Sequence, residues 1–125
     1  MIARLQCTVL DCPDPLGLAR FYAALTGGAV NRPDPQWSLD DDWSTVHTPD
    51  GQVLAFQRAA DFRPPRWPDP ESPQQFHLDL AVEDLGAAHA EVVALGATVL
   101  DRVASGRGFH VYADPAGHPF CLVAH

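Results

Sequence analysis

The sequence contains no lysine, and the short motifs that mark many enzyme classes are also missing. All eight basic residues among its 125 are arginine, which excludes chemistry on a lysine Schiff base and a P-loop lysine. The chain also lacks a glycine-rich dinucleotide motif, a hydrolase nucleophile elbow and a zinc-protease motif. No single short motif therefore assigns a function.

Positive charge and long apolar runs are scarce as well. Sixteen acidic residues against eight basic ones give a net charge of −8, and such a surface repels nucleic acid and anionic membranes. No apolar stretch approaches the roughly 20 residues of a membrane span, and residues 1–5 do not resemble a signal peptide. We expect a soluble, cytoplasmic protein without a nucleic-acid or membrane partner.

Cysteine is too scarce for a disulfide framework. Cys7, Cys12 and Cys121 are odd in number and irregularly spaced, and no CxxC pair suggests a structural zinc site. The remaining composition is that of an ordinary globular protein, because 46% of the residues are hydrophobic and 19% are charged. The length suits one domain with a real hydrophobic core.

The pattern predicts the same order of elements twice. In the first half we expect a strand over residues 2–11, a helix capped by Asp14 and ended by Gly27, and strands near 29–31, 43–48 and 52–58. In the second half we expect a strand over 76–82, a helix capped by Asp84 and ended by Gly96, and strands near 98–102, 109–113 and 119–124. The buried stripe predicted for the second helix consists of Leu85, Ala88, Val92 and Leu95.

Two offsets support an internal repeat. A shift of 70 residues aligns Asp14 with Asp84, and a shift of 66 aligns Gly51 with Gly117. Five prolines between the halves exclude a helix or a central strand there. We therefore predict an α+β fold of two βαβββ modules, about 1–58 and 76–125, joined by a Pro-rich linker at about 59–75 within a single domain 1–125.

The ordered motifs of both halves resemble one superfamily. They are DCPDP (11–15), FY (21–22), LTG (25–27), HLDL (77–80), LGA (95–97) and DPAGHPFC (114–121). The chain resembles the vicinal oxygen chelate superfamily of glyoxalase I, bleomycin-resistance proteins and extradiol dioxygenases, and most of all its glyoxalase-like branch. The resemblance implies a cup-shaped mixed sheet with the helices outside, a small-molecule ligand in the cup, a homodimer and, in the enzymes, a divalent metal.

The resemblance also implies where metal ligands would stand, on the first and last strands of each module. Those positions hold Cys7, Ala55 (with Gln57 next on the same face), His77 and Cys121. No carboxylate is among them, so the ligand sets of glyoxalase I and of the extradiol dioxygenases are absent. Cys7, His77 and Cys121 could still bind Zn, Ni or Fe; otherwise the cysteines are small buried hydrophobes.

His77 is the candidate catalytic residue. Inside the cup it could act as an acid, a base or a donor to a carbonyl. The alternative is a purely structural pairing with Asp79, which shares its strand face.

A cup without metal must hold its ligand by stacking and a few polar anchors. The candidate ligand-binding residues are Trp43, Gln57, Trp67, His110 and Tyr112, and further aromatic candidates are Trp37, Phe56 and Phe62. Trp67, in the linker, could close the cup as a lid or simply seal the module junction. We expect His47, His89 and His125 at the surface.

Three functions follow from these observations. The first is a glyoxalase-like protein that binds a small organic molecule without cofactor, as a resistance or sequestering protein does. The alternative is a glyoxalase-class lyase or isomerase that uses His77, with or without a divalent metal. The third is an interaction module whose dimer interface is the functional surface.

Overall fold

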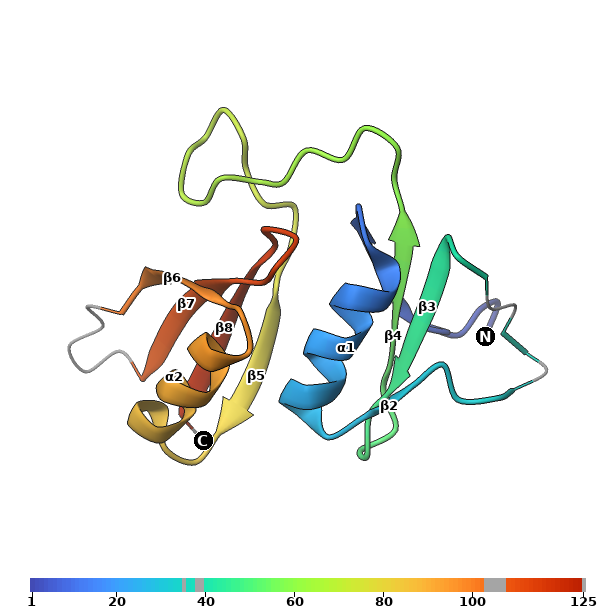
Figure 1. Ribbon diagram of the computed structural model, residues 1–125, viewed down its shortest axis with the longest axis horizontal. Helices are drawn as coiled ribbons and strands as arrows, with labels where there is room; N and C mark the ends of the chain where they lie inside the picture. Colours follow the sequence, from blue (N-terminus) through green and yellow to red (C-terminus); the bar gives the residue numbers. More distant parts are fainter. Residues whose placement is uncertain (35, 38–39, 103–107, 125) are drawn as a thin grey trace. The chain divides into compact units, whose positions relative to one another are not determined.

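The computed structural model describes residues 1–34, 36–37, 40–102 and 108–124, and Figure 1 shows the arrangement of its elements. Two compact units, Met1–Phe62 and Arg63–His125, divide the chain inside the predicted linker. The first unit contains β1 (Thr8–Cys12), α1 (Pro15–Thr26), β2 (Ala29–Val30), β3 (Trp43–His47) and β4 (Val53–Arg58). The second contains β5 (Leu78–Val82), α2 (Leu85–Ala94), β6 (Thr98–Asp101), β7 (Phe109–Ala113) and β8 (Pro119–Ala124).

Each unit has one mixed sheet with the same topology. The strand orders are β1-β4-β3-β2 and β5-β8-β7-β6, and in both sheets the first strand pairs with the last in parallel. Thr8 lies opposite Leu54 in one sheet, and Leu78 lies opposite Phe120 in the other. These pairs differ by 70 and 66 residues, the two offsets of the sequence repeat. The prediction of two βαβββ modules is confirmed.

Both helices begin at the predicted aspartate caps, and α1 also ends at the predicted glycine. The Asp14 carboxylate accepts a hydrogen bond from the Gly17 N–H at 3.1 Å, and Asp84 accepts one from the Ala87 N–H at 3.0 Å. Gly27 and Gly96 follow the helices with φ of 77° and 113°, a conformation that a side chain rarely adopts. Neither described helix combines the length and the hydropathy needed to span a membrane.

The core of each unit contains a tyrosine ring stacked on a phenylalanine ring, but the tyrosine comes from a different element in each unit. In the first unit, Tyr22 of α1 stacks on Phe56 of β4 with ring centroids 5.6 Å apart. In the second, Tyr112 of β7 stacks on Phe120 of β8 at 5.7 Å. All four rings are fully buried.

Comparing equivalent positions shows a reciprocal exchange of large and small side chains. Tyr22 corresponds to Val92 by the offset of 70, whereas Val46 corresponds to Tyr112 by the offset of 66. Both valines are fully buried. The large ring therefore comes from the helix in one unit and from a strand in the other, which conserves the volume of the core.

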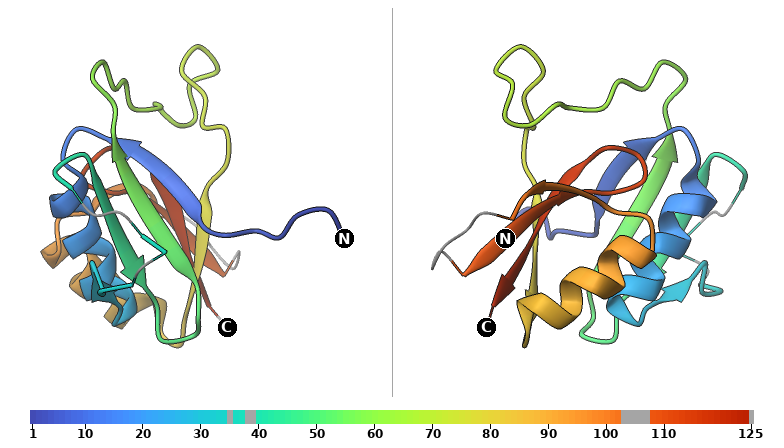
Figure 2. Two further views of the ribbon diagram at one scale, coloured as in Figure 1. Left: turned by 90° about the vertical axis from the view of Figure 1, so that its right-hand side faces the viewer. Right: turned by 60° about the vertical axis from the view of Figure 1, so that its left-hand side comes forward.

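Three expectations about element ends and burial are wrong. β1 begins at Thr8 rather than at residue 2, because parallel pairing would place the residues before Cys7 opposite the β3–β4 turn, where no strand continues. Figure 2 shows the chain leading away from the sheet there. β5 likewise begins at Leu78, and Phe76 is exposed. On α2, Val92 is buried but Leu95 is 39% exposed, because the helix ends at Ala94.

The hydrogen bond from the Ala87 N–H to the Asp84 side chain can be tested for its contribution to stability. We predict that Asp84→Ala lowers the free energy of unfolding by about 1 kcal/mol, because the Ala87 N–H loses its partner. Asp84→Asn keeps an acceptor and should be nearly neutral. Glu83→Ala, at the neighbouring exposed position, serves as the control in urea denaturation, and an equal loss in both alanine variants would contradict the prediction.

Candidate functional site

Each sheet has one face against its own helix and one face turned away from it, which we call the helix-free face. On the first unit, α1 packs on β3 and β4, and the buried Leu54 and Phe56 lie on that side. The alternating side chains of the same strands lie on the helix-free face. There the register places Gln57 between Asp11 of β1 and Trp43 of β3.

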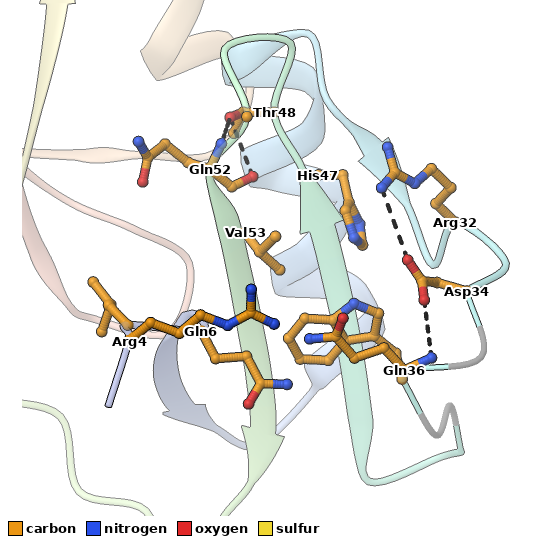
Figure 3. Close-up of a pocket in the computed structure, with 12 residues that line it drawn as sticks. Arg4, Gln6, Arg32, Asp34, Gln36, His47, Thr48, Gln52 and Val53 are labelled. Carbon is orange, nitrogen blue, oxygen red and sulfur yellow. Dashed lines mark hydrogen bonds and ion pairs between the residues drawn. The ribbon is translucent and has the colours of Figure 1, made fainter. Parts of the chain in front are cut away.

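Two cavities adjoin each other on the helix-free face of the first unit. One has a volume of about 290 Å³ and reaches from the N-terminal segment across His47 to the β2–β3 segment, as Figure 3 shows. The other, of about 620 Å³, is lined in part by Cys7, Trp43 and Gln57. Both are lined by Trp37. The structure thus brings together three residues that the sequence singled out separately.

Trp37 lines both cavities and contacts an aromatic ring in each of them. Its ring stacks on that of Trp43 with centroids 6.5 Å apart and planes inclined by 21°. It meets the ring of His47 edge-on, at 6.1 Å and 84°. Of the other aromatic candidates, Phe56 belongs to the core on the opposite face.

Arg58 is fixed at the rim of the larger cavity. Its Nε donates to the Asp42 carboxylate at 2.9 Å, and its other nitrogens donate to the backbone oxygens of Asp41 and Pro13. The three aspartates at 40–42 therefore do more than form an exposed turn, because one of them orients this arginine.

His47 is buried, so the expectation of a surface position is wrong. Only 8% of the residue is exposed, and its Nδ1 is buried without a hydrogen-bond partner. Burial, and then the charge of Arg32, lower the pKa of the imidazole, while Asp34 acts in the opposite direction. The sequence contained a signal for this position. Trp43, Thr45 and His47 occupy every second position of the strand, so all three lie on one strand face.

The second unit presents a different set of groups on its helix-free face. Nε2 of His77 lies 3.2 Å from the Asp79 carboxylate, which confirms the predicted pairing. Asp79 lies beside Cys121 in the parallel register, and the ligand atoms of the three residues all lie within 4.8 Å of one another. Burial, followed by the charge and hydrogen bond of Asp79, raises the pKa of the Cys121 thiol to about 11.

This cluster adds a residue to the predicted ligands. The sequence grouped His77 and Cys121 with Cys7, which belongs to the first unit, and that grouping stays a prediction. Asp79 supplies a carboxylate that the four predicted positions lacked. Sequence reasoning paired Asp79 with His77 but did not count it as a ligand, because it stands two residues beyond the expected position.

His110 and Tyr112 lie on the other face of the second sheet, on the side of α2. Nδ1 of His89, on that helix, is 2.9 Å from the Tyr112 hydroxyl, and Nδ1 of His110 is 3.3 Å from it. The structure therefore brings both residues together with His89 and not with His77. His89 is half-buried rather than on the surface; His125 is outside the described residues.

Trp67 lies in the Pro-rich segment at the start of the second unit. The backbone there turns tightly, with Arg66 N–H donating to the Ser72 oxygen at 2.7 Å. Its role as a lid or as a seal stays a prediction.

Comparison with known proteins defines the family. The model of the glyoxalase-like domain matches residues 7–123, so the chain belongs to the glyoxalase-like domain family. No sequence among the curated proteins matches it significantly.

Several solved structures share the fold. A glyoxalase/bleomycin resistance protein/dioxygenase family enzyme from Burkholderia phytofirmans has a TM-score of 0.71 at 14% identity, over 96% of this chain and 97% of that one. The fosfomycin resistance protein FosX from Listeria monocytogenes, in complex with Mn(II) and a phosphonic acid, has a TM-score of 0.71 at 16% identity, over 99% and 93%. Hypothetical protein SA1046 from S. aureus has a TM-score of 0.70 at 19% identity, with both chains fully covered.

The environment of His110 predicts a pH dependence of stability. Burial first, and then the charges of Arg102 and His89, lower the pKa of His110, against a smaller opposite effect of Asp101. The unfolded chain therefore binds a proton at His110 more readily than the folded protein does. The free energy of unfolding is unaffected by this group above about pH 6.5 and decreases as the pH falls below that value. His47 acts in the same direction.

We predict that the free energy of unfolding falls from pH 7.5 to 5.5, and that it falls less in His110→Gln. Urea denaturation at a series of pH values measures this. His118→Gln, in the turn before β8, is the control for loss of an imidazole in the same unit. A wild-type slope that His110→Gln leaves unchanged would contradict the assignment.

Proposed function

We propose that the protein binds a small organic molecule on the helix-free face of its first unit and does so without a metal ion. The observation that carries this proposal is a pair of cavities that share Trp37, whose ring stacks on Trp43 in the larger one. Cavities of this size suit small ligands, and half-buried indole rings provide flat apolar surface for stacking. A sequestering protein of the resistance type needs binding of this kind and no chemical step.

Polar side chains make up most of the lining around the rings, and some of them are held in place by hydrogen bonds. Gln57 offers an amide, and Arg58 is fixed by three hydrogen bonds. Ala55, at one of the positions where the superfamily has metal ligands, is fully buried and has no ligand atom. These features favour a site that works by shape, stacking and hydrogen bonds. A homodimer, expected from the resemblance, belongs to the same proposal and can be measured by sedimentation.

A substitution of Trp37 tests the proposed binding of a small molecule directly. In a thermal-shift screen of small aromatic compounds, we predict at least one compound that stabilises the protein and binds at least fivefold more weakly to Trp37→Ala, since stacking contributes about 1 kcal/mol. Leu16→Ala, at a partly exposed position on α1, is the control. A screen without binders, or equal affinity for both variants, would contradict the proposal.

A second candidate function rests on His77, Asp79 and Cys121. Their imidazole, carboxylate and thiol groups are close enough to share one divalent ion such as zinc. The thiolate suits zinc better than the Mn(II) of the Listeria FosX structure, which prefers oxygen ligands. When bound, the ion would supply Lewis-acid chemistry for a lyase or isomerase. His77 and Asp79 would both be ligands, and Cys121 would bind after losing its proton.

Zinc titration separates this candidate from a purely structural cluster. We predict that one equivalent of zinc binds the protein and protects Cys121 from alkylation by iodoacetamide, followed on its peptide by mass spectrometry. Asp79→Asn should weaken zinc binding at least tenfold, because a ligating carboxylate is lost. The matched control, Glu83→Gln, should bind zinc normally. Unprotected Cys121 at saturating zinc would exclude the site; nickel and iron can be tested in the same way.

A further inference from the structure

His47 is a buried polar side chain that neither candidate function uses. It lies on β3 with 8% of its surface exposed, and Nδ1 has no hydrogen-bond partner. Two residues earlier on the same strand face, the fully buried Thr45 also has a hydroxyl without a partner. Buried polar groups are nearly always hydrogen-bonded. Of these two residues, His47 lines the smaller cavity, whereas Thr45 lines neither cavity.

The burial of Nδ1 decides which atom His47 can offer. A neutral imidazole carries one proton, and a buried nitrogen without an acceptor is the wrong place for it. The proton therefore belongs on Nε2, and the ring offers this N–H to the cavity that it lines. Burial and the nearby Arg32 both lower the pKa of His47, so the ring is neutral at pH 7 and acts as a hydrogen-bond donor.

The cavity around His47 carries an excess of positive charge. Arg4 and Arg32 line it together with one carboxylate, that of Asp34. Figure 3 shows Asp34 between its two partners, Arg32 at 4.0 Å and the Gln36 N–H at 2.9 Å. Among the described residues, Arg4 has no hydrogen bond or ion pair. One cation thus remains without a counter-charge in a chain whose net charge is −8, and this suits a ligand with a single negative charge.

The walls of the same cavity suit a flat ring. Trp37 lines it and meets His47 edge-on. A volume of about 290 Å³ is at the lower end for small-molecule sites, which favours one aromatic ring with one small substituent.

We propose that this cavity binds small aromatic carboxylates, with the ring against Trp37 and the carboxylate accepting hydrogen bonds from His47 Nε2–H and Arg4. This inference rests on the proposed function and specifies its ligand class. A planar carboxylate can accept from a guanidinium and an imidazole at the same time. A second negative charge would have no partner, so phosphate should bind poorly.

Benzoate is the probe, and three relatives isolate its parts. Benzamide keeps the ring and the shape but has no charge, acetate keeps the charge but has no ring, and inorganic phosphate replaces the carboxylate by a more highly charged anion. In NMR or calorimetric titrations, we expect benzoate to bind at least tenfold more tightly than each of the three. Its affinity should decrease with added salt, because the contact to Arg4 is exposed.

Three variants test the named groups. Arg4→Gln changes an exposed side chain outside the strands and should weaken benzoate binding at least fivefold, whereas Arg20→Gln on the exposed side of α1 should not. His47→Leu should weaken it at least tenfold, and His47→Gln, which keeps an N–H donor, should restore most of the affinity. Circular dichroism verifies that each variant is folded. If both His47 variants fail to fold, the Arg4 and Arg20 pair decides.

The outcomes separate this inference from the proposed function. If benzamide binds as well as benzoate and Trp37→Ala weakens both, the small-molecule site stands and the assignment of an acid is wrong. If phosphate or acetate binds as well as benzoate, the site is an anion site without ring recognition, and the inference is again wrong. If none of the probes binds and the aromatic screen is also empty, both proposals fail.

Discussion

The parallel pairing of the first strand with the last strand in each unit is the constraint on which the rest depends. Parallel neighbours cannot be joined by a tight turn, so the chain must cross over through a helix and two further strands before it returns. The helix covers one face of the sheet. On the other face, side chains from the start of the unit lie beside side chains from its end, as Asp79 lies beside Cys121. Residues far apart in sequence can thereby form a site.

The same framework presents two different sets of side chains, because the two units differ at equivalent positions. The pair that corresponds to His77 and Cys121 in the first unit is Cys7 and Ala55, which cannot provide an imidazole or a second thiol. That unit instead has tryptophans against its cavities. The exchange of Tyr22 and Val46 for Val92 and Tyr112 shows that even the core could change, provided that its volume was kept. Strand pairing, rather than any individual side chain, is what the two units share.

Much of this fold could be predicted from the sequence, because its signals are local. An aspartate before an apolar stripe predicts a helix start, a glycine predicts its end, and two constant offsets predict the repeat. The start of β1 could not be predicted, since it depends on where the partner strand begins. The burial of His47 depends likewise on Trp37, which comes from a segment without regular structure. Asp79 was recognised as a partner of His77, but its approach to Cys121 requires the register between β5 and β8.

The charge of the chain limits how a ligand reaches the site in the first unit. With a net charge of −8, the protein as a whole repels an anion, and at physiological ionic strength fields are screened within about 8 Å. Arg4 and Arg32 therefore attract an anion only when it is within about 8 Å of them. Association therefore gains nothing from long-range steering, and affinity must come from contacts inside the cavity. A neutral donor such as His47 fits this situation, because its hydrogen bond is hardly weakened by salt and requires no buried charge in the empty site.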